Sequence, residues 1–421
     1  MKSIIQMGFL ATALIASAML TSCKKDNTSD TNDQPGDPVN ITLQVYQKEV
    51  VDSANQFAIE LFKPILADVG ETKNVMISPF SITSALSMTL NGAADKTFDD
   101  IRIALGMNGK TLDEINDTYL KLMTEMVPVD KRVVVEIANS VWVEKRLAVK
   151  PPFITALQTW YKSESRSIDV ADPQAVATVN GWIADKTHNK ITNMLDRLDP
   201  DLAMLLINAV YFNGKWRYQF KKTETKEEPF FVSPTAPKTV PMMHQKANMK
   251  VVQTNNAAIV EIPYGQGNYT MVVVLPNENM TTNEVATSLN AAQWREWMEL
   301  LNRNTHEVNL SLPRFKYEFK RLLNDDLTAQ GMGIAFTDKA NFSNISDQGL
   351  MINRVLHQTF IETNEEGSEA AAATVAEMGI TSVEPTQPVT VTINRPFLYF
   401  IRETSTGTVL FMGRVSDPTM N

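Results

Sequence analysis

The side chains that most often do chemistry are few in this sequence and form no familiar catalytic pattern. Histidine occurs only at His188, His244, His306 and His357, and there is a single cysteine. The zinc-binding pattern HExxH is absent, as are CxxC pairs and the nucleophile or phosphate-binding patterns GxSxG, GxxxxGK[ST] and GxGxxG. The sequence therefore predicts no metal and no cofactor, and it does not predict an enzyme.

The single cysteine, Cys23, ends an apolar amino-terminal run. The run MKSIIQMGFLATALIASAMLTSC stops before Lys24, which is too short for a membrane-spanning helix and typical of a signal peptide. Its ending, LTSC, is similar to a bacterial lipobox, in which the chain is cut before the cysteine and the sulfur is lipidated. We expect a signal peptide over 1–22 and a lipidated Cys23 with a flexible tether over 23–44. Secretion with an incidental cysteine is the alternative.

The residue after the cysteine bears on where the protein is anchored. Lysine at position 24, rather than aspartate, favours the outer membrane over retention in the inner one. We therefore expect an exported protein that is lipid-anchored to a bacterial outer membrane, on its periplasmic or its cell-surface face. The sequence does not distinguish these two faces.

An unusual run of four alanines lies near the carboxyl end, in NEEGSEAAAATVAEMGITSVEP (364–385). Taken alone, this composition favours a helix, because alanine and glutamate are good helix formers. Alternation along a strand offers a second interpretation. Counting from Ser368, one parity contains only small or apolar residues, and both Glu369 and Glu377 fall in the other. As a strand, the segment could bury its first face without burying a charge, while its second face stays in water.

The rest of the chain predicts one large α+β domain over 45–421. Of the 421 residues, 43% are hydrophobic and 21% are charged, which is typical of a globular protein. The net charge of −9 argues against nucleic acid as a partner. No linker and no repeat interrupts residues 45–417, so we expect a single domain that is large for its class.

Several segments carry helical signals. Apolar residues at helical spacing predict an amphipathic helix over 45–66. A second helix should begin at Ser78-Pro79 and stop at Asn91-Gly92, and its small apolar side chains predict that it lies under a sheet. Helical patches also occur in AVATVNGWIADKTHN and NAAQWREWMELLNRN.

The later two-thirds of the chain are rich in predicted strands. These are RVVVEIANSVWVE (132–144), LAMLLINAVYFNG (202–214), AIVEIPY (258–264), YTMVVVLP (269–276) and EVNLSLPRFKYEF (307–319). Some alternate and others are apolar throughout, which predicts sheets covered on one or both faces. The segment NRPFLYFIRETSTGTVLFMGRVSDP predicts a hairpin that turns at 404–407.

Several motifs, in their order along the chain, resemble those of one family. They are NVMISPFSITSALSMTLNGAADKTFDDI, VNGWIADKTHNKI, LLINAVYFNGKWRYQF, VPMMHQ, LPRFKYE, HQTFIETNEEGSEAAAAT and NRPFLYFIRETSTGTVLFMGRVSDP. Over essentially all of 45–417 the chain resembles a serpin. The resemblance implies three β-sheets, eight or nine helices and an exposed reactive-centre loop, here at about 365–393. It also implies a monomer that traps serine, sometimes cysteine, proteases by irreversible suicide inhibition through a covalent complex.

The resemblance assigns the opening part of the loop to a hinge that inserts into a sheet after cleavage. The hinge residues are Glu365, Glu366, Gly367, Ser368, Glu369, Ala370, Ala371, Ala372, Ala373 and Thr374. Residues 367–372 follow the inhibitory pattern of the family. The small side chains among them would let a strand enter a packed gap, where bulky intrusions cost about 1–3 kcal/mol each. A non-inhibitory serpin that acts as a binding protein is the alternative.

The bait bond is expected fourteen positions after the hinge glycine, as is common in inhibitory serpins. This count from Gly367 gives Thr381, with Ser382 after the cut. The return segment is slightly longer than usual, so Met378-Gly379 and Ile380-Thr381 stay as alternatives.

The composition around the bait restricts the target. No Lys, Arg, Phe, Tyr or Trp occurs between Gly367 and Ile393, so a trypsin-like pocket with its buried aspartate has nothing to bind. Small residues suit an elastase-like serine protease. A papain-like cysteine protease, which would use Ile380, and a glutamate-specific protease, which would use Glu377 or Glu384, are weaker alternatives.

The resemblance also implies residues that control the sheet. Ser78, Ser81, Asn208 and His357 should form a hydrogen-bonded cluster under its centre, where strands part to admit the loop. Trp216 should lie near the top, where insertion starts. His357 is not expected to act as a general base, since no nucleophile is indicated beside it.

Overall fold

The second helix illustrates how local sequence sets the ends of the elements. The computed structural model describes residues 36–368 and 387–420. In it, α2 (Pro79–Leu90) begins directly after Ser78, whose side chain accepts a hydrogen bond from the Ser81 amide. Proline suits the first helical position, where an N–H would have no partner in the helix. All residues of α2 except Ala85 are buried, so the predicted buried helix with its predicted ends is confirmed.

Nine α-helices lie in the described part of the chain, in agreement with the expected eight or nine. They are α1 (Val45–Val69), α2 (Pro79–Leu90), α3 (Asp95–Ala104), α4 (Leu112–Met126), α5 (Pro151–Tyr161), α6 (Ala175–Lys186), α7 (Thr282–Ser288), α8 (Ala291–Arg303) and α9 (Asn324–Leu327). The helices predicted around 45–66, 175–189 and 290–304 are confirmed as α1, α6 and α8.

The strands account for most of the remaining regular structure. They are β1 (Val75–Ile77), β2 (Val133–Glu144), β3 (Glu164–Ile168), β4 (Met204–Lys215), β5 (Lys226–Ser233), β6 (Ala236–Gln253), β7 (Ala257–Pro263), β8 (Tyr269–Pro276), β9 (Thr305–Pro313), β10 (Phe315–Leu322), β11 (Leu356–Thr363), β12 (Gly367–Ser368), β13 (Val389–Thr392), β14 (Phe397–Glu403) and β15 (Val409–Val415). The predicted carboxyl-terminal hairpin is confirmed as the antiparallel pair β14 and β15.

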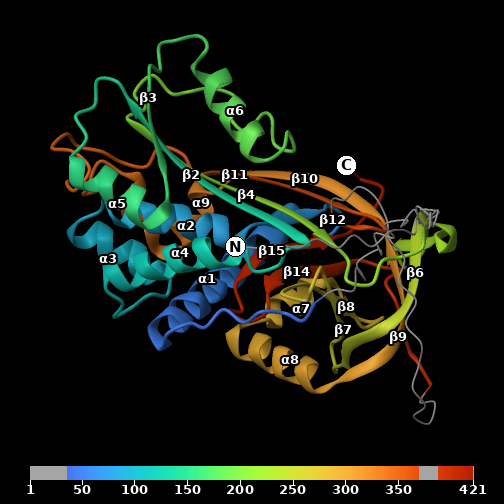
Figure 1. Ribbon diagram of the computed structural model, residues 1–421. Helices are drawn as coiled ribbons and strands as arrows, with labels where there is room; N and C mark the ends of the chain where they lie inside the picture. Colours follow the sequence, from blue (N-terminus) through green and yellow to red (C-terminus); the bar gives the residue numbers. More distant parts are fainter. Residues whose placement is uncertain (1–35, 369–386, 421) are drawn as a thin grey trace, which may run out of the picture. The chain divides into compact units, whose positions relative to one another are not determined.

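Hydrogen bonding joins these strands into a nine-stranded and a six-stranded sheet (Figure 1). The larger sheet has the order β1-β15-β14-β8-β7-β6-β9-β13, with β5 also on β6. The long strand β6 pairs with β5 over residues 236–242, with β9 over residues 242–250 and with β7 only at Lys250–Gln253. The larger sheet can therefore be divided at β6 into one group of strands with β5 and β9 and another group with β7 and β8. Together with the six-stranded sheet, these two groups correspond to the three sheets expected of a serpin fold.

The predicted single strand over 307–319 is in fact two strands in different sheets. β9 ends at Pro313 in the larger sheet, and β10 starts at Phe315 in the smaller one. Pro313 has no N–H to continue a ladder, and the Arg314 amide bonds the Pro241 carbonyl instead. The alternation shifts by one residue at this break, from apolar residues at Val308, Leu310 and Leu312 to apolar residues at Phe315, Tyr317 and Phe319, so the sequence did carry a sign of the break that a single-strand prediction overlooks.

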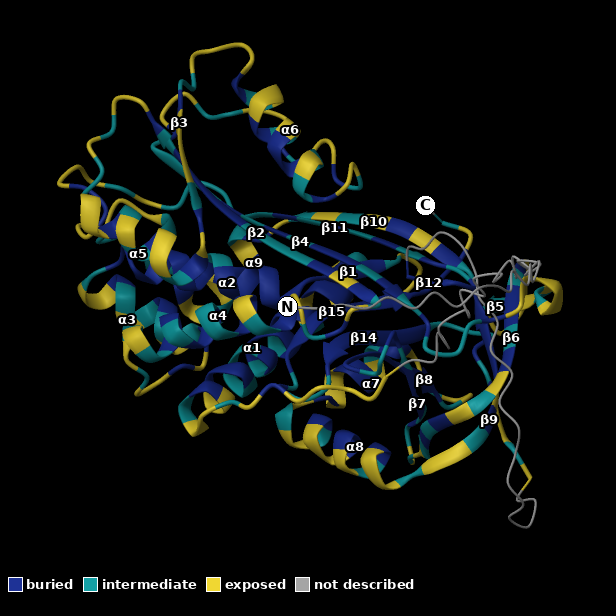
Figure 2. Ribbon diagram, viewed as in Figure 1, coloured by how far each residue is buried: buried dark blue, intermediate teal, exposed yellow. Residues whose placement is uncertain are grey.

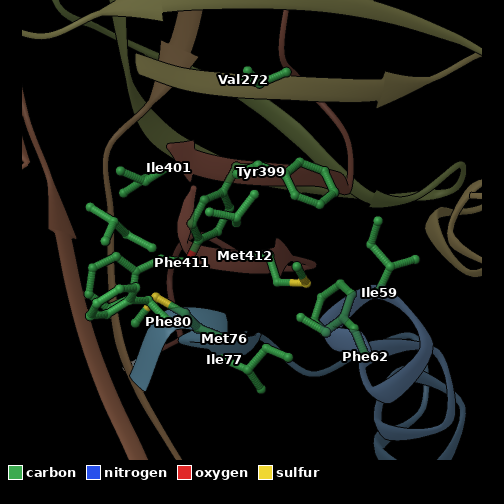
Figure 3. Packing of buried hydrophobic residues seen from close by; sticks show 14 of the residues in the cluster. Ile59, Phe62, Met76, Ile77, Phe80, Val272, Tyr399, Ile401, Phe411 and Met412 are labelled. Carbon is green, nitrogen blue, oxygen red and sulfur yellow. The ribbon is translucent and has the colours of Figure 1, made fainter. Parts of the chain in front are cut away.

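The main core lies between α1, α2 and the inner strands of the larger sheet. Figure 3 shows Phe62 of α1, Tyr399 of β14 and Met412 of β15 among the side chains gathered there. Strands β8, β14 and β15 are buried along their whole length, as Figure 2 shows by their colour. This explains why their sequences are apolar without alternation.

A second, smaller core lies on the opposite face of the six-stranded sheet, under α6. Trp182 and Ile183 of α6 pack there against Ile207 and Ala209 of β4. We expected the outward face of an inserted segment to stay in water. The structure corrects this for the lower part of the sheet, because α6 covers it, whereas Glu362 near the upper end is half-buried.

The residues just before α1 lie along the domain. Val39 and the side chain of Asn268 exchange two hydrogen bonds, and the Ile41 amide bonds the Ser405 hydroxyl. Ile41 itself is buried in the main core. Residues 36–44, which belong to the segment expected to be a flexible tether, are therefore held by specific contacts; the remainder of that segment, 23–35, lies outside the described residues.

Candidate functional site

The six-stranded sheet contains an incomplete position between its strands. Its order is β10-β11-β12-β4-β2-β3, and β12 consists only of Gly367 and Ser368. Ser368 pairs with Thr363 of β11 on one side and with Gly214 of β4 on the other. Below Ser368, no ladder between described residues joins β4 to β11. We call this gap between β4 and β11 the seam.

The seam opens into a cavity of about 160 Å³. Ile82 and Leu86 of α2 line one side of it, Leu206 and Val210 of β4 another, and Leu356 of β11 a third. Because β4 and β11 lack ladder partners here, their backbone amides and carbonyls are available to bond an added strand. The cavity therefore has the two features that an inserted strand needs, namely free strand edges and space for small side chains.

Ser78, Ser81 and His357, predicted to form a cluster below the sheet, do meet there. The Ser78 amide donates to Nε2 of His357 at 3.0 Å, and the Ser78 hydroxyl donates to the Leu410 carbonyl at 2.7 Å. The Ser81 amide donates to the Ser78 hydroxyl at 3.3 Å. These bonds tie the start of α2 to β11 and β15 at the floor of the seam.

Asn208, the fourth predicted member, joins the cluster through its backbone. Its carbonyl accepts a hydrogen bond from the Ser81 hydroxyl at 3.3 Å, and its side-chain amide donates to Asn139 of β2 at 2.7 Å. Its Oδ1 atom is buried and has no hydrogen-bond partner. An unsatisfied acceptor on the wall of the seam is a group that an incoming donor would stabilise.

Trp216 lies at the top of the seam, as expected. Its ring stacks on Tyr264 with the centroids 4.3 Å apart, and its indole N–H donates to the Asn364 carbonyl at 2.9 Å. Its backbone amide bonds the Glu366 carbonyl at 2.8 Å. Trp216 therefore fixes the chain between β11 and β12 to the end of β4.

The two hinge glutamates are held by cations that the sequence analysis did not single out. Glu365 is only 1% exposed and accepts hydrogen bonds from Arg314 and from the Thr225 hydroxyl. Burial alone would raise the pKa of the Glu365 carboxyl, but the bonds from Arg314 and Thr225 lower it below its ordinary value. Glu366 pairs with Lys222 at 2.6 Å. Arg314 lies in the motif LPRFKYE, directly after Pro313. This position between two strands was the one sign in the sequence that could have singled it out.

Gly367 is required by the close approach of the hinge to β4. A Cβ atom at this position would lie 2.0 Å from the Gly214 carbonyl oxygen, a contact that no side chain can make. Gly214 is itself confined, since its own Cβ would lie 2.8 Å from the rings of Phe212 and Tyr264. The two glycines let β12 start against β4.

The first residue of the alanine-rich segment lies in a strand and not in a helix. The Ser368 side chain points into the core, where its hydroxyl lies 2.7 Å from the Tyr264 hydroxyl and 3.2 Å from that of Thr363. This is the face that the parity of the sequence assigned to burial. The remaining predicted hinge and bait residues, Glu369, Ala370, Ala371, Ala372, Ala373, Thr374, Met378, Gly379, Ile380, Thr381 and Ser382, lie outside the described residues, as does Cys23.

Comparison with known families agrees with this geometry. Residues 52–418 match the family model described as serpin (serine protease inhibitor). The chain belongs to the serpin family. The description of the family is of protease inhibitors and not of catalysts. No group of three or more His, Cys, Asp or Glu side chains in the described part of the chain could hold a metal ion. No helix among the same residues is long and apolar enough to cross a membrane.

Individual serpins match over most of their length. An uncharacterized serpin-like protein of Methanosarcina acetivorans is 34% identical and covers 88% of both chains. The human leukocyte elastase inhibitor is 33% identical and covers 88% of this chain and 100% of its own. Among solved structures, the thermophilic serpin tengpin in its native state has a TM-score of 0.80 at 32% identity, with 91% of this chain and 97% of its own covered.

The Glu365 pair gives a first prediction for this serpin. Replacing Glu365 by lysine buries a cation beside Arg314 with no anion, and we expect a loss of about 3 kcal/mol in the free energy of unfolding, at the low end for a broken pair because the Arg314 side chain is partly exposed. Chemical denaturation of the purified domain measures it. Glu318→Lys, on an exposed position of β10, is the control and should change stability by less than about 0.5 kcal/mol. Equal effects of the two substitutions would contradict a special role for the Glu365 pair.

His357 gives a second prediction, on pH. Burial lowers the pKa of His357 from 6.5 to about 4. Between these two pH values His357 is therefore protonated in the unfolded chain and neutral in the folded chain. Stability is therefore complete above pH 6.5 and falls as the pH drops from 6.5 to 4, by on the order of 3 kcal/mol. Unfolding free energies across this range should fall less steeply for His357→Gln, which has no titrating group. Parallel curves for the two proteins would overturn this account.

Proposed function

We propose that this serpin irreversibly inhibits serine proteases by inserting its reactive-centre loop into the seam. One observation supports this above all: Gly367 and Ser368 already lie as a strand between β4 and β11, at the entrance to an unfilled position. The loop segment that follows would need only to continue the strand it has begun.

The ladder of β12 defines the register of that continuation. Ser368 lies opposite Gly214, and each further residue would move one step down β4, so that Met378 would meet Met204, the first residue of β4. On β11, Ser368 lies opposite Thr363. In this register Thr374 would lie between Asn208 and His357, where its hydroxyl could donate to the unsatisfied Asn208 side chain.

The covalent step is ordinary acyl transfer that stops half-way. The protease serine oxygen would attack the carbonyl carbon of Thr381, and the bond to the Ser382 nitrogen would break, with the leaving amine taking its proton from the protease histidine. The Thr381 acyl group would then be an ester on the protease. Thirteen residues from Ser368 to Ile380, at roughly 3.3 Å each, would carry that ester about 43 Å during insertion.

We propose that the target has a shallow, elastase-like specificity pocket. The segment between Gly367 and Ile393 offers no cationic or aromatic side chain, and one relative at 33% identity is named leukocyte elastase inhibitor. Met378-Gly379 and Ile380-Thr381 are alternative bonds, and papain-like cysteine proteases are an alternative target through Ile380.

Progress curves with a panel of proteases test this function. Elastase-like enzymes should lose activity with time and should not recover it on dilution, whereas trypsin-like enzymes should stay active. Recovery on dilution for every enzyme, or clean cleavage of the serpin without loss of activity, would contradict inhibition and direct attention to a binding function.

We also propose that the serpin is anchored to a bacterial outer membrane by a lipid on Cys23. The proposal rests on the LTSC sequence and on Lys24. Expression of the full chain in a Gram-negative host with an alkyne-labelled fatty acid should label the wild type and not Cys23→Ser. Equal labelling, or release of the wild type into the medium, would contradict the anchor.

A further inference from the structure

A short strap crosses the seam directly below the end of β12. We define the strap as residues 187–191, which follow α6 (Figure 1). Thr187, Lys190 and Ile191 line a small cavity together with Tyr211 of β4, Phe360 of β11 and, at its upper end, Ser368. Its volume is about 30 Å³, which holds a water molecule or two but not a residue. A strand that grows beyond Ser368 must therefore pass under the strap and displace it.

On the β4 side, the strap is anchored by His188. Its ring lies on that of Tyr211 with the centroids 4.2 Å apart, and Nε2 is 3.2 Å from Glu136 of β2. His188 and Asn189 both have left-handed backbone angles, with φ of 50° and 61°. Two successive left-handed residues form a tight turn, so the backbone on this side of the strap cannot extend without changing these angles.

On the β11 side, the strap is anchored by Lys190. Its ammonium group lies 5.0 Å from the centre of the Phe360 ring and 4.0 Å from Glu362. Lys316 of β10 approaches the same two groups, at 5.7 Å from the ring and 3.4 Å from the carboxylate. We call this arrangement of Lys190, Phe360, Lys316 and Glu362 the clamp.

The two anchors of the strap lie on opposite sides of the seam although they are only two residues apart in sequence. An inserted strand needs about 4.8 Å to each neighbour, so the strap cannot keep both anchors once a strand lies beneath it. The side chain of Lys190 is long and has many rotamers, whereas His188 belongs to the left-handed turn that sets the course of the strap. The clamp is therefore the anchor that can open without refolding the backbone.

We propose that release of Lys190 from the clamp limits the speed of loop insertion in this serpin and so sets how often an acylated protease is trapped. This inference rests on the proposed inhibitory function. Lys190 is a positioning residue: we expect it to act by holding the strap and not by taking part in acyl transfer.

Kinetics with an elastase-like protease in excess test the clamp in the purified full-length domain. We expect Lys190→Ala to raise the limiting rate of complex formation about threefold to tenfold, which is the effect expected from removing the contacts of Lys190 with the Phe360 ring and Glu362. The protease concentration at half the limiting rate should stay unchanged, because the bait loop is intact. Lys190→Arg should restore the wild-type rate, since a guanidinium group also binds an aromatic face.

Lys186→Ala is the matched control. Lys186 also lies over an aromatic ring, that of Trp182, at 5.8 Å, and also pairs with a glutamate, Glu164, at 2.9 Å. The first contact lies within α6 and the second joins α6 to β3. Neither crosses the seam, so the limiting rate should stay at the wild-type value. An unchanged rate in Lys190→Ala, or an equal increase in both variants, would overturn the clamp.

A second readout separates failure of the clamp from failure of the proposed function. A synthetic peptide with the sequence of residues 368–378 can be added to each protein, and its incorporation followed on a native gel. If the wild type traps no protease, the inhibitory proposal fails, and the peptide still tests the clamp. Faster incorporation into Lys190→Ala than into Lys186→Ala supports it, and equal rates contradict it.

Discussion

Replacing Ala372 by arginine is expected to turn this serpin from an inhibitor into a substrate. In the register set by β12, residue 372 would lie between Val210 of β4 and Thr359 of β11 and would point into the same core as Ser368. The cavity there is lined mainly by aliphatic side chains and described residues place no carboxylate in its wall. An arginine would have to be buried without an anion, which costs several kcal/mol.

The expected readout is the fate of the protease. A barrier higher by about 3 kcal/mol slows insertion by more than a hundredfold, so hydrolysis of the acyl-enzyme would win. Gels under denaturing conditions should then show cleaved Ala372→Arg protein, little covalent complex and an active protease. Association with the protease should be unaffected, because the bait sequence is unchanged.

Glu369→Arg is the matched control for this experiment. Position 369 has the opposite parity and would lie beside Glu362 near the upper end of the sheet, where that side chain is half-buried. A charge is tolerated there in the natural sequence, so this variant should still form the complex. Stoichiometric trapping by Ala372→Arg, or loss of trapping by both variants, would refute the assignment of the buried face.

Cleavage of the reactive-centre loop is expected to raise the melting temperature of the wild-type domain by at least about 10 °C. The inserted strand would fill the cavity of about 160 Å³, a gain on the order of 4 kcal/mol by the usual cavity relation. It would also give ladder partners to the facing edges of β4 and β11. The uncleaved protein has neither the filled cavity nor the added ladder bonds, and it persists because insertion is slow.

Calorimetry before and after limited cleavage within 375–386 measures this change. Cleaved Ala372→Arg protein should keep the melting temperature of its uncleaved form, since the same cut leaves its strand outside the sheet. No increase in the wild type would show that the seam is not filled, whatever the protease assays report.

Local sequence signals were sufficient for the elements that surround the seam. Ser78 followed by a proline fixed the start of α2, and unbroken apolar runs identified the buried strands of the larger sheet. The prediction of one strand failed at Pro313, where two strands of different sheets follow each other and the apolar residues change from even to odd positions. The missing proline N–H explains why the ladder ends there, and the shift in the apolar pattern marks the same place.

The candidate site could be predicted only where its residues belong to recognisable motifs. Ser78, Ser81, His357 and Trp216 lie where the resemblance to serpins implied. Arg314, Lys222 and Lys190 were missed, because each acts through a partner that is distant in the sequence, and a lone cation in a polar stretch gives no sign of it. The seam exists because β4 and β11 are not paired with each other below β12. The pairing of strands that are distant in the chain cannot be predicted from a local sequence pattern.

The central claim is that the loop is cut, retains the protease as an ester and inserts. Intact mass spectrometry of the product formed with an elastase-like protease tests it most directly. We expect a denaturation-resistant species that contains the protease and the serpin up to Thr381, together with a released peptide that begins at Ser382. Two serpin fragments with a free, active protease and no joined species would contradict it.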